Sequence, residues 1–270
     1  MSGSGLVSFL SREQHYLNQH CLDVCRTAAI HGDADSLRHV LRHLDPHQLI
    51  VICRLAAQHG HVECLACAYT QDCHRDEGVC EAAAQYGHLD CLRYAHEHGF
   101  PLGEDCVVLA ARCGQFECLE YLILSGCPCP PDDVADGFMH IHALHGGDVR
   151  CLQLLYERAG CTTWSDETCH RAAADGMIDF LQYLHEHECP WDERTWVKAI
   201  AGKHLDCLRY AYENGCPMKK TFVNPGPIWG VDILRFLESH NLAYDLLDVP
   251  NHLRGLHSRA RPHQGHFYTN

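Results

Sequence analysis

The sequence predicts an all-α solenoid, a stack of about seven to eight helix-turn-helix units, and three observations support this fold class. First, the phrase GHLDCLRYAHEHG over residues 87–99 returns as KHLDCLRYAYENG over residues 203–215, with ten of thirteen positions identical. Second, weaker copies recur with a period of about 27 residues, which is typical of proteins built from one small stacked unit. Third, the apolar residues within each copy have helical spacing.

Each unit is expected to open with a helix that ends at a glycine. Alignment of the copies on this position gives Gly32, Gly60, Gly87, Gly114, Gly147, Gly176, Lys203 and Trp229. Seven residues earlier stand mostly cysteines or other apolar residues, and three and four residues earlier stand mostly alanine pairs such as Ala56 and Ala57. These positions form one apolar stripe, and paired alanines allow a neighbouring helix to approach closely. The glycine ends the helix because it adopts the left-handed conformation at little cost.

A second helix is expected directly after the glycine. Its apolar positions lie two, five and eight residues further on, as in Leu89, Leu92 and Ala95. The third residue after the glycine position is acidic in seven of eight copies: Asp35, Glu63, Asp90, Glu117, Asp179, Asp206 and Asp232. A carboxylate there complements the helix dipole and the free amides of the first turn. We therefore assign these acids a structural role and not a catalytic one.

The units are joined by short connectors such as HGFPLGED and HECPWDERT, in which Gly and Pro end one helix and Asp or Thr begins the next. The expected organisation is an N-terminal cap over residues 1–20, the repeat array over residues 21–249, and a disordered basic tail over residues 250–270. One connector, Ser125 to Met139, carries six extra residues. Its length is compatible either with a tolerated insertion or with a projecting loop that binds.

The last unit departs from the pattern. The stretch TFVNPGPIWG over residues 221–230 replaces its first helix, and its two prolines and two glycines forbid a regular helix. The following segment VDILRFLESH is expected to be a helix that caps the array, because a solenoid needs a terminal unit with a polar outer face.

The composition indicates a folded chain without export or membrane signals. Of the 270 residues 46% are hydrophobic, no run of 18 or more is apolar, and the start MSGSGLVSFLSREQH lacks the regions of a signal peptide. We therefore expect a cytoplasmic protein with no membrane partner, whose nineteen cysteines are reduced thiols packed as small hydrophobic side chains. The net charge of −14 argues against nucleic-acid binding and favours a basic or neutral partner surface.

The segments AAQYGHLDCLRYAHEHG and AAQHGHVECLACAY resemble the second half of an ankyrin repeat, in which AA, two variable residues and GH precede an amphipathic helix. The resemblance covers roughly Cys21 to Asp245. The TPLH tetrapeptide of that family is absent, and most units are about six residues shorter than the usual 33. This short form is similar to ankyrin-type repeats of giant viruses of amoebae and of some protists. The shortening argues against the projecting β-hairpins of standard ankyrin repeats.

The resemblance implies a scaffold that binds a partner protein through its concave helix face and loops, without catalysis. In that family the two residues between AA and GH commonly face the partner. The corresponding candidates are Gln58, His59, Gln85, Tyr86, Arg112, Cys113, His145 and Asp175, with Gly146 and Ala174 completing the pairs. Tyr and Arg are among the residue types most enriched at binding hot spots. For each candidate the alternative is an ordinary solvated helix end.

The many histidines and cysteines raise the question of zinc. The closest ligand spacing is that of Cys64, Cys67, Cys73 and His74, and a second candidate is the pair Cys127 and Cys129, two thiols expected to be exposed and open to oxidation. However, Cys64 belongs to a column of cysteines that recurs in successive units, too far apart to share one ion. We therefore expect neither a metal nor a cofactor.

Catalysis is not expected either, because no phosphate loop, nucleophile elbow or HExxH motif is present. The paired histidines are interpreted as polar helix-end residues: His96, His98, His185 and His187. Two alternatives to a partner-binding scaffold stay open. One is a structural or virion component that self-associates, and the other is a zinc- or thiol-dependent module. The scaffold itself is expected to be a monomer or to self-associate weakly.

Overall fold

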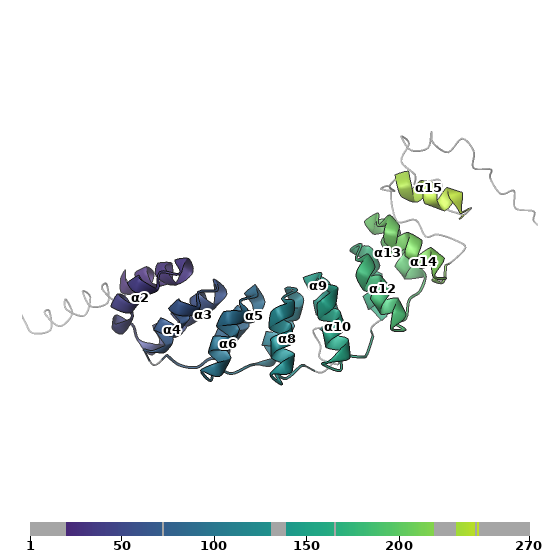
Figure 1. Ribbon diagram of the computed structural model, residues 1–270. Coiled ribbons are helices and arrows are strands. Elements are labelled where there is room, and N and C mark those ends of the chain that lie inside the picture. Colours follow the sequence, from purple (N-terminus) through teal and green to yellow (C-terminus); the bar gives the residue numbers. More distant parts are fainter. Residues whose placement is uncertain are drawn as a thin grey trace, which may run out of the picture. The chain divides into compact units, whose positions relative to one another are not determined.

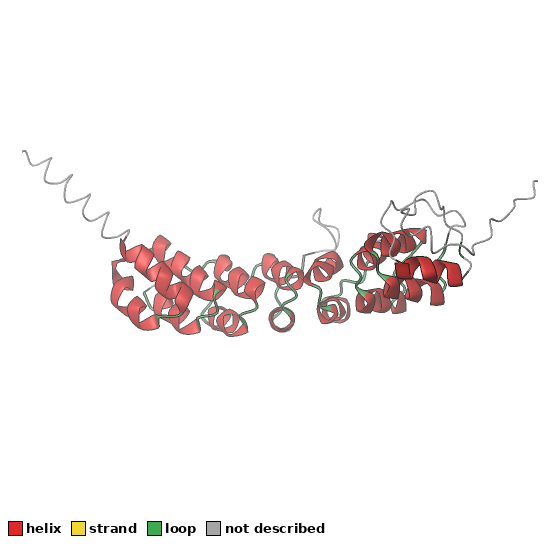
Figure 2. Cartoon of the chain, turned by 90° about the horizontal axis from the view of Figure 1, so that it is seen from above, coloured by secondary structure: helices red, strands yellow, loops and turns green. Residues whose placement is uncertain are grey.

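The computed structural model describes residues 20–71, 73–130, 139–164, 166–218, 231–240 and 242. Over these residues the regular elements are helices joined by loops, without strands (Figure 1, Figure 2), so the expected all-α class is confirmed. The chain divides into two compact units, Met1–Thr163 and Trp164–Asn270. The expected N-terminal cap apart from His20, residues 131–138 of the long connector, the stretch 221–230 and the basic tail lie outside the described residues.

The first unit is a stack of helix pairs. Its elements are a helix over residues 20–31, α2 (Ala34–Val40), the short 3-10 helix η1 (Leu41–His43), α3 (Pro46–Gln58), α4 (Val62–Tyr69), α5 (Glu77–Tyr86), α6 (Leu89–Glu97), α7 (Glu104–Arg112), α8 (Phe116–Leu124), α9 (Met139–Gly146) and α10 (Val149–Glu157). The first helices of successive pairs pack in the order α3, α5, α7, α9, and the second helices pack in the order α2, α4, α6, α8, α10. The stack therefore has two layers, with α3, α5 and α9 above α4, α6 and α10 in Figure 1.

The second unit has the same construction. Helix α11 (Asp166–Ala174) packs on α13 (Glu193–Gly202), and α12 (Ile178–Glu186) packs on α14 (Leu205–Glu213). The segment expected to cap the array forms α15 (Val231–Ser239). Its apolar face is buried, and the rings of Phe236 and Tyr212 of α14 meet edge to face with centroids 5.7 Å apart.

The two helices of a pair begin in different ways. At α3, the carboxylate of Asp45 accepts the backbone amide of Gln48 at 2.8 Å, the side chain of Gln48 accepts the amide of Asp45 at 3.1 Å, and Pro46 occupies the first turn. The second helices α4, α6, α8, α12 and α14 have no such side-chain cap, but each carries the predicted acid in its first turn. In these helices the first-turn acid, and not a capping side chain, supplies the negative charge that favours the N-terminal end of the helix dipole.

Small side chains fill the space between neighbouring repeats. The alanine pairs are fully buried, and so are the cysteines four residues after each glycine. Three of these thiols lie 4.0 Å from an alanine carbonyl oxygen of the preceding repeat, in the pairs Cys64 with Ala28, Cys91 with Ala56, and Cys118 with Ala83. Because interiors are close-packed, a larger side chain in either place would push the repeats apart.

The glycine that ends a first helix has a steric role besides its conformational one. Gly60 has φ +77°, and a Cβ there would lie 2.6 Å from Nδ1 of His88 in the next repeat. His88 occupies this space because its Nε2 hydrogen-bonds the carbonyl oxygen of Gln58 at 3.0 Å. His61 makes the same contact with the carbonyl oxygen of Ile30 at 3.1 Å. The glycine of one repeat therefore leaves space for the histidine of the next repeat, and the two residues together form a contact between repeats.

Lys203, which replaces the glycine in the second unit, keeps the left-handed conformation with φ +65°. In this repeat the residue that lies close to a neighbouring repeat is the preceding one, Gly202. A Cβ there would lie 2.4 Å from the carbonyl oxygen of Ala174. The lysine therefore bears a conformational cost of about 1 kcal/mol, while a glycine still occupies the crowded position.

Replacing Gly60 by alanine is expected to destabilise the protein more than replacing Gly147. Both glycines have a left-handed φ, +77° and +73°, so each substitution strains the backbone by about 1 kcal/mol. Only the Cβ at Gly60 would meet a neighbour, His88, since no described atom lies within 4 Å of a Cβ at Gly147. Urea denaturation should show a loss of about 1 kcal/mol for Gly147→Ala and about 2 kcal/mol or more for Gly60→Ala. Equal losses would contradict the steric role.

A charged side chain in the buried alanine stripe of α13 should destabilise the second unit. Ala199 of α13 is fully buried, whereas Ala201 of the same helix is exposed. Ala199→Asp is expected to lower the free energy of unfolding by about 3 kcal/mol or more, because the carboxylate would be buried without a partner. Ala201→Asp should change it by about 0.5 kcal/mol at most. Thermal melts of both variants, with Ala56→Asp as the counterpart in the first unit, test this ranking.

Candidate functional site

The first helices of the first unit bring most of the predicted partner-binding residues together. These residues stand at the ends of α3, α5, α7 and α9, and we call them the helix-end row: Gln58, His59, Gln85, Tyr86, Arg112, Cys113 and His145. Because the four helices stack side by side, equivalent positions on them face the same way. The side chains of His59, Tyr86, Arg112, Cys113 and His145 are exposed, and those of Gln58 and Gln85 are half-buried.

The backbone under this row is held by the following repeat. The carbonyl oxygen of Gln58 accepts a hydrogen bond from His88, and that of Gln85 accepts one from the side-chain amide of Gln115 at 3.5 Å. These contacts use main-chain oxygens of the row and not its side chains. Tyr86 is 47% exposed, which is unusual for an aromatic residue of a soluble domain.

Asp175, the remaining candidate, lies in the second unit, directly after α11. Its carboxylate oxygen Oδ2 accepts from Nε of Arg171 at 3.0 Å, one helical turn earlier. Asp175 is thus exposed but already paired with a cation, and its role in binding a partner stays a prediction.

A group of acids on the same helices, towards the ends opposite to the row, was not predicted from the sequence. Glu77 and Glu81 of α5 and Glu104 and Asp105 of α7 lie on adjacent first helices. Burial raises the pKa of Glu81, and the nearby carboxylates of Glu77 and Asp105 raise it further. The acids are spread over two repeats, and only the stacking of α5 on α7 shows that they belong to one acidic face.

The second helices and connectors carry contacts between repeats rather than free side chains. Nδ1 of His96 lies 2.8 Å from the hydroxyl of Tyr121 in the next repeat, and in the second unit Nδ1 of His185 lies 3.0 Å from the hydroxyl of Tyr210. The ring of His98 stacks on Tyr94 with centroids 3.9 Å apart. The interpretation of these histidines as simple polar helix ends is therefore wrong, because each contacts an aromatic residue of its own or the next repeat.

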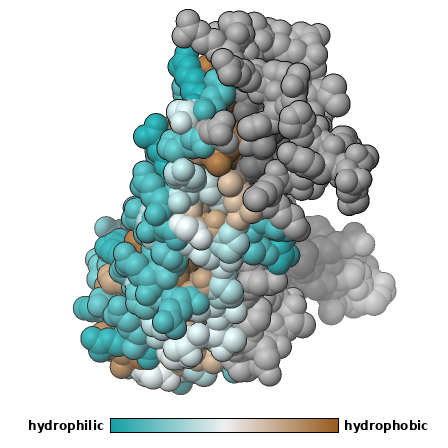
Figure 3. Space-filling model, turned by 90° about the vertical axis from the view of Figure 1, so that its right-hand side faces the viewer, coloured by the Kyte–Doolittle hydropathy of each residue, from teal (hydrophilic) through white to brown (hydrophobic). Residues whose placement is uncertain are grey.

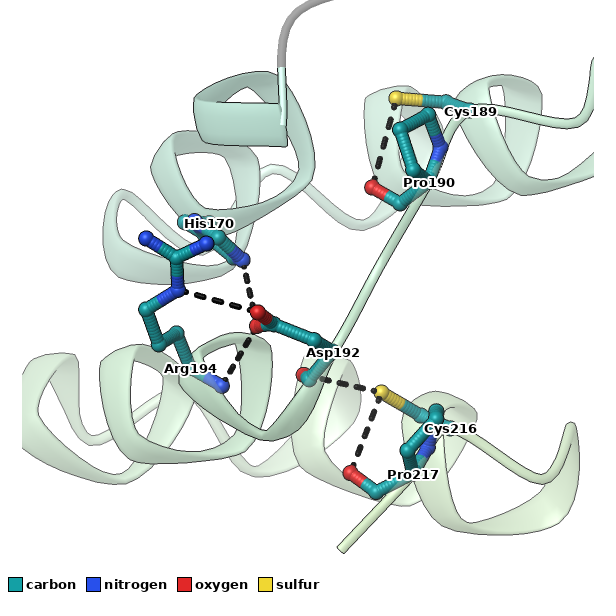
Figure 4. Close-up of polar contacts among 7 residues, drawn as sticks. All are labelled: His170, Cys189, Pro190, Asp192, Arg194, Cys216 and Pro217. Atoms are coloured by element: carbon teal, nitrogen blue, oxygen red, sulfur yellow. Dashed lines mark hydrogen bonds and ion pairs between the residues drawn. The ribbon is translucent and has the colours of Figure 1, made fainter.

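A polar network joins the first helices of the second unit (Figure 4). Asp192 caps α13, where its carboxylate accepts the amide of Arg194 at 2.8 Å and lies 2.7 Å from Nε2 of the buried His170 of α11. Burial would raise the pKa of Asp192, but the hydrogen bonds from Arg194 and His170 outweigh it and hold this pKa below its usual value. Arg54 and Asp76 form an ion pair at the corresponding place in the first unit, between α3 and the start of α5. Each of these two carboxylates stands just before a first helix and contacts a basic side chain of the preceding first helix, so both serve stacking.

The described residues contain no group of three or more His, Cys, Asp or Glu side chains that could hold a metal ion. The candidate ligands point to different places: Cys64 approaches Ala28, and the sulfur of Cys73 lies 3.3 Å from that of Cys53. The expectation of two exposed thiols at Cys127 and Cys129 is wrong. Cys127 is buried and its thiol donates to the carbonyl oxygen of Gly103 at 3.4 Å, whereas Cys129 is half-buried.

Residues 80–123, which run from within α5 to the last turn of α8, match the family described as ankyrin repeats (many copies). This segment is therefore similar to ankyrin repeats. The fold is also similar to the human ASB11 ankyrin repeat domain, with a TM-score of 0.52 and 17% sequence identity over 62% of this chain and 84% of that one. No curated protein matches the chain.

The ankyrin fold accounts for the two layers and for the position of the helix-end row. The predicted absence of β-hairpins agrees with the described connectors, which contain no strand. Among the described helices none combines the length and the apolar character that crossing a bilayer requires. The face that Figure 3 displays is mostly hydrophilic over its described part, with hydrophobic residues in small groups. An ankyrin array with such a surface is generally a protein-binding scaffold.

Glu81→Gln should stabilise the protein at neutral pH. The folded-state pKa of Glu81 is raised, so the folded state binds its proton more tightly than the unfolded state, and stability falls as the pH rises through this window. We expect the variant to gain about 0.5 kcal/mol at pH 7 and nothing near pH 3, where the carboxyl is protonated in both states. Glu117→Gln is the control, because it removes a first-turn charge that favours its helix. Urea denaturation at both pH values measures the difference, and a loss of stability for Glu81→Gln at pH 7 would refute the assignment.

Proposed function

We propose that this chain is an adaptor or scaffold that binds a partner protein through the helix-end row of its first unit. The observation that carries the proposal is the set of exposed, chemically varied side chains at equivalent positions of stacked rigid helices. Tyr86 and Arg112 stand on the adjacent helices α5 and α7. They would be the anchors of the interface, because tyrosine and arginine are enriched among the residues that contribute most of the binding free energy.

The partner surface is proposed to be basic or neutral. The whole chain has a net charge of −14, and α5 and α7, which carry Tyr86 and Arg112, also carry acids in their first turns. Complementary charge speeds association and excludes acidic competitors such as nucleic acid. A cytoplasmic location, and the host cytoplasm if the chain is viral, belongs to the same proposal.

Affinity purification with the full chain, followed by mass spectrometry, would supply the partner, and titration calorimetry with the purified partner then tests the surface. The double variant Tyr86→Ala/Arg112→Ala should weaken binding at least tenfold, or about 1.4 kcal/mol, without changing the melting temperature. The control is Leu124→Ala, because Leu124 is 70% exposed at the end of α8 in the other layer.

Unchanged affinity of the double variant, together with weaker binding of Leu124→Ala, would place the interface on the second helices and refute the proposal. Sedimentation of the chain alone distinguishes a scaffold from a component that self-associates. A scaffold should sediment as a monomer at micromolar concentration, whereas large assemblies would favour the structural alternative.

A further inference from the structure

Two cysteines that follow a second helix donate their thiols to a carbonyl oxygen of the preceding connector. Cys127 donates to Gly103 at 3.4 Å, and Cys216 donates to Asp192 at 3.3 Å, as Figure 4 shows for the second of these contacts. Cys161 is at the equivalent place after α10, since its amide bonds Leu155 as the amide of Cys127 bonds Leu122. Its sulfur instead lies 3.6 Å from the sulfur of Cys129.

This pair of thiols differs from the enclosed thiol pairs in its access to solvent. Cys53 and Cys73 have sulfurs 3.3 Å apart but are 0% and 6% exposed, and the hydrogen bond with Cys73, together with burial, raises the pKa of Cys53 well above its usual range. Cys169 and Cys189, which also contact each other, are 0% and 3% exposed. In the pair of Cys129 and Cys161, Cys161 is 5% exposed, but Cys129 is half-buried and therefore within reach of a small oxidant.

We propose that Cys129 and Cys161 are a site of reversible oxidation, at which a hydroperoxide converts the two thiols into a disulfide. The thiolate of Cys129 attacks the peroxide oxygen, the O–O bond breaks, and a sulfenic acid and one molecule of water form with hydrogen peroxide. The thiolate of Cys161 then attacks the Cys129 sulfur, the S–O bond breaks, and a second water leaves. Two protons and two electrons have passed from the thiols to the peroxide.

The geometry favours this bond over others in the same connector. The two sulfurs must approach by about 1.5 Å to reach the disulfide length, and both lie in connectors rather than inside helices. Cys127 is only two residues from Cys129, but its thiol is buried and turned towards Gly103. The disulfide would close a loop that contains α9, α10 and the longest connector, and Cys161 lies two residues before the first unit ends at Thr163. Oxidation would therefore constrain the repeat that ends the first unit.

The test uses the full chain, reduced and then titrated with hydrogen peroxide, with remaining thiols alkylated before digestion and mass spectrometry. A peptide linked through Cys129 and Cys161, lighter by two hydrogens and restored by dithiothreitol, is the expected product. It should form at a peroxide concentration at least tenfold below that needed to link Cys53 and Cys73, because that pair is enclosed. Fragmentation of the linked peptide locates the bond in the unsubstituted protein.

Matched variants separate the two neighbouring cysteines. Cys127→Ser should keep the linked peptide, whereas Cys129→Ser should abolish it. The oxidised unsubstituted protein should melt several degrees above the reduced one, and Cys129→Ser should show no such shift, because closing a long loop restricts the unfolded chain. A bond from Cys161 to Cys127, a link between two chains, or oxidation of Cys53 and Cys73 at the same peroxide concentration would overturn the proposal.

Discussion

The fold depends on the close approach of each repeat to the carbonyl end of the preceding first helix. There the carbonyl oxygen of Ala56 accepts the amide of His61 from its own repeat at 2.9 Å and lies 4.0 Å from the thiol of Cys91 in the next. Two residues further, the carbonyl oxygen of Gln58 accepts a hydrogen bond from His88 across the glycine. Backbone acceptors that would otherwise be unsatisfied at a helix end are thereby paired, and only small residues leave the necessary space. A single repeat cannot supply these partners, so the units are stable only as a stack.

This constraint also separates the surfaces available for function. The Ala and Cys residues of the stripe are buried between stacked repeats. The aromatic residues of the second helices contact neighbouring repeats, as Tyr121 contacts His96. At the ends of α3 and α5, the carbonyl oxygens of Gln58 and Gln85 accept hydrogen bonds from the next repeat, and the side chains of His59 and Tyr86 are exposed.

Connectors contribute charge and sulfur chemistry that the helices do not. Asp76 and Asp192 stand at the N-cap position of a first helix and contact Arg54 and His170 of the preceding first helix, and the hydrogen bonds of Asp192 hold its pKa below its usual value. The connector after α8 is longer than the others, and its half-buried Cys129 has its sulfur 3.6 Å from that of Cys161. An irregular repeat in a regular array can thus hold a thiol pair that is more accessible than the enclosed pairs of other repeats.

The sequence by itself determined the helices, their glycine ends, the buried Ala and Cys stripe and the positions of the helix-end row, because all of these follow from local spacing within about 27 residues. Only the tertiary structure decided the partners of His96, the grouping of Glu81 with Asp105, the burial of Cys127 and the pairing of Cys129 with Cys161. These residues are separated along the chain by a repeat or more, and no local pattern specifies which side chains meet. Stacking brings them within contact distance, so the geometry between repeats, and not the composition of one repeat, determines their chemistry.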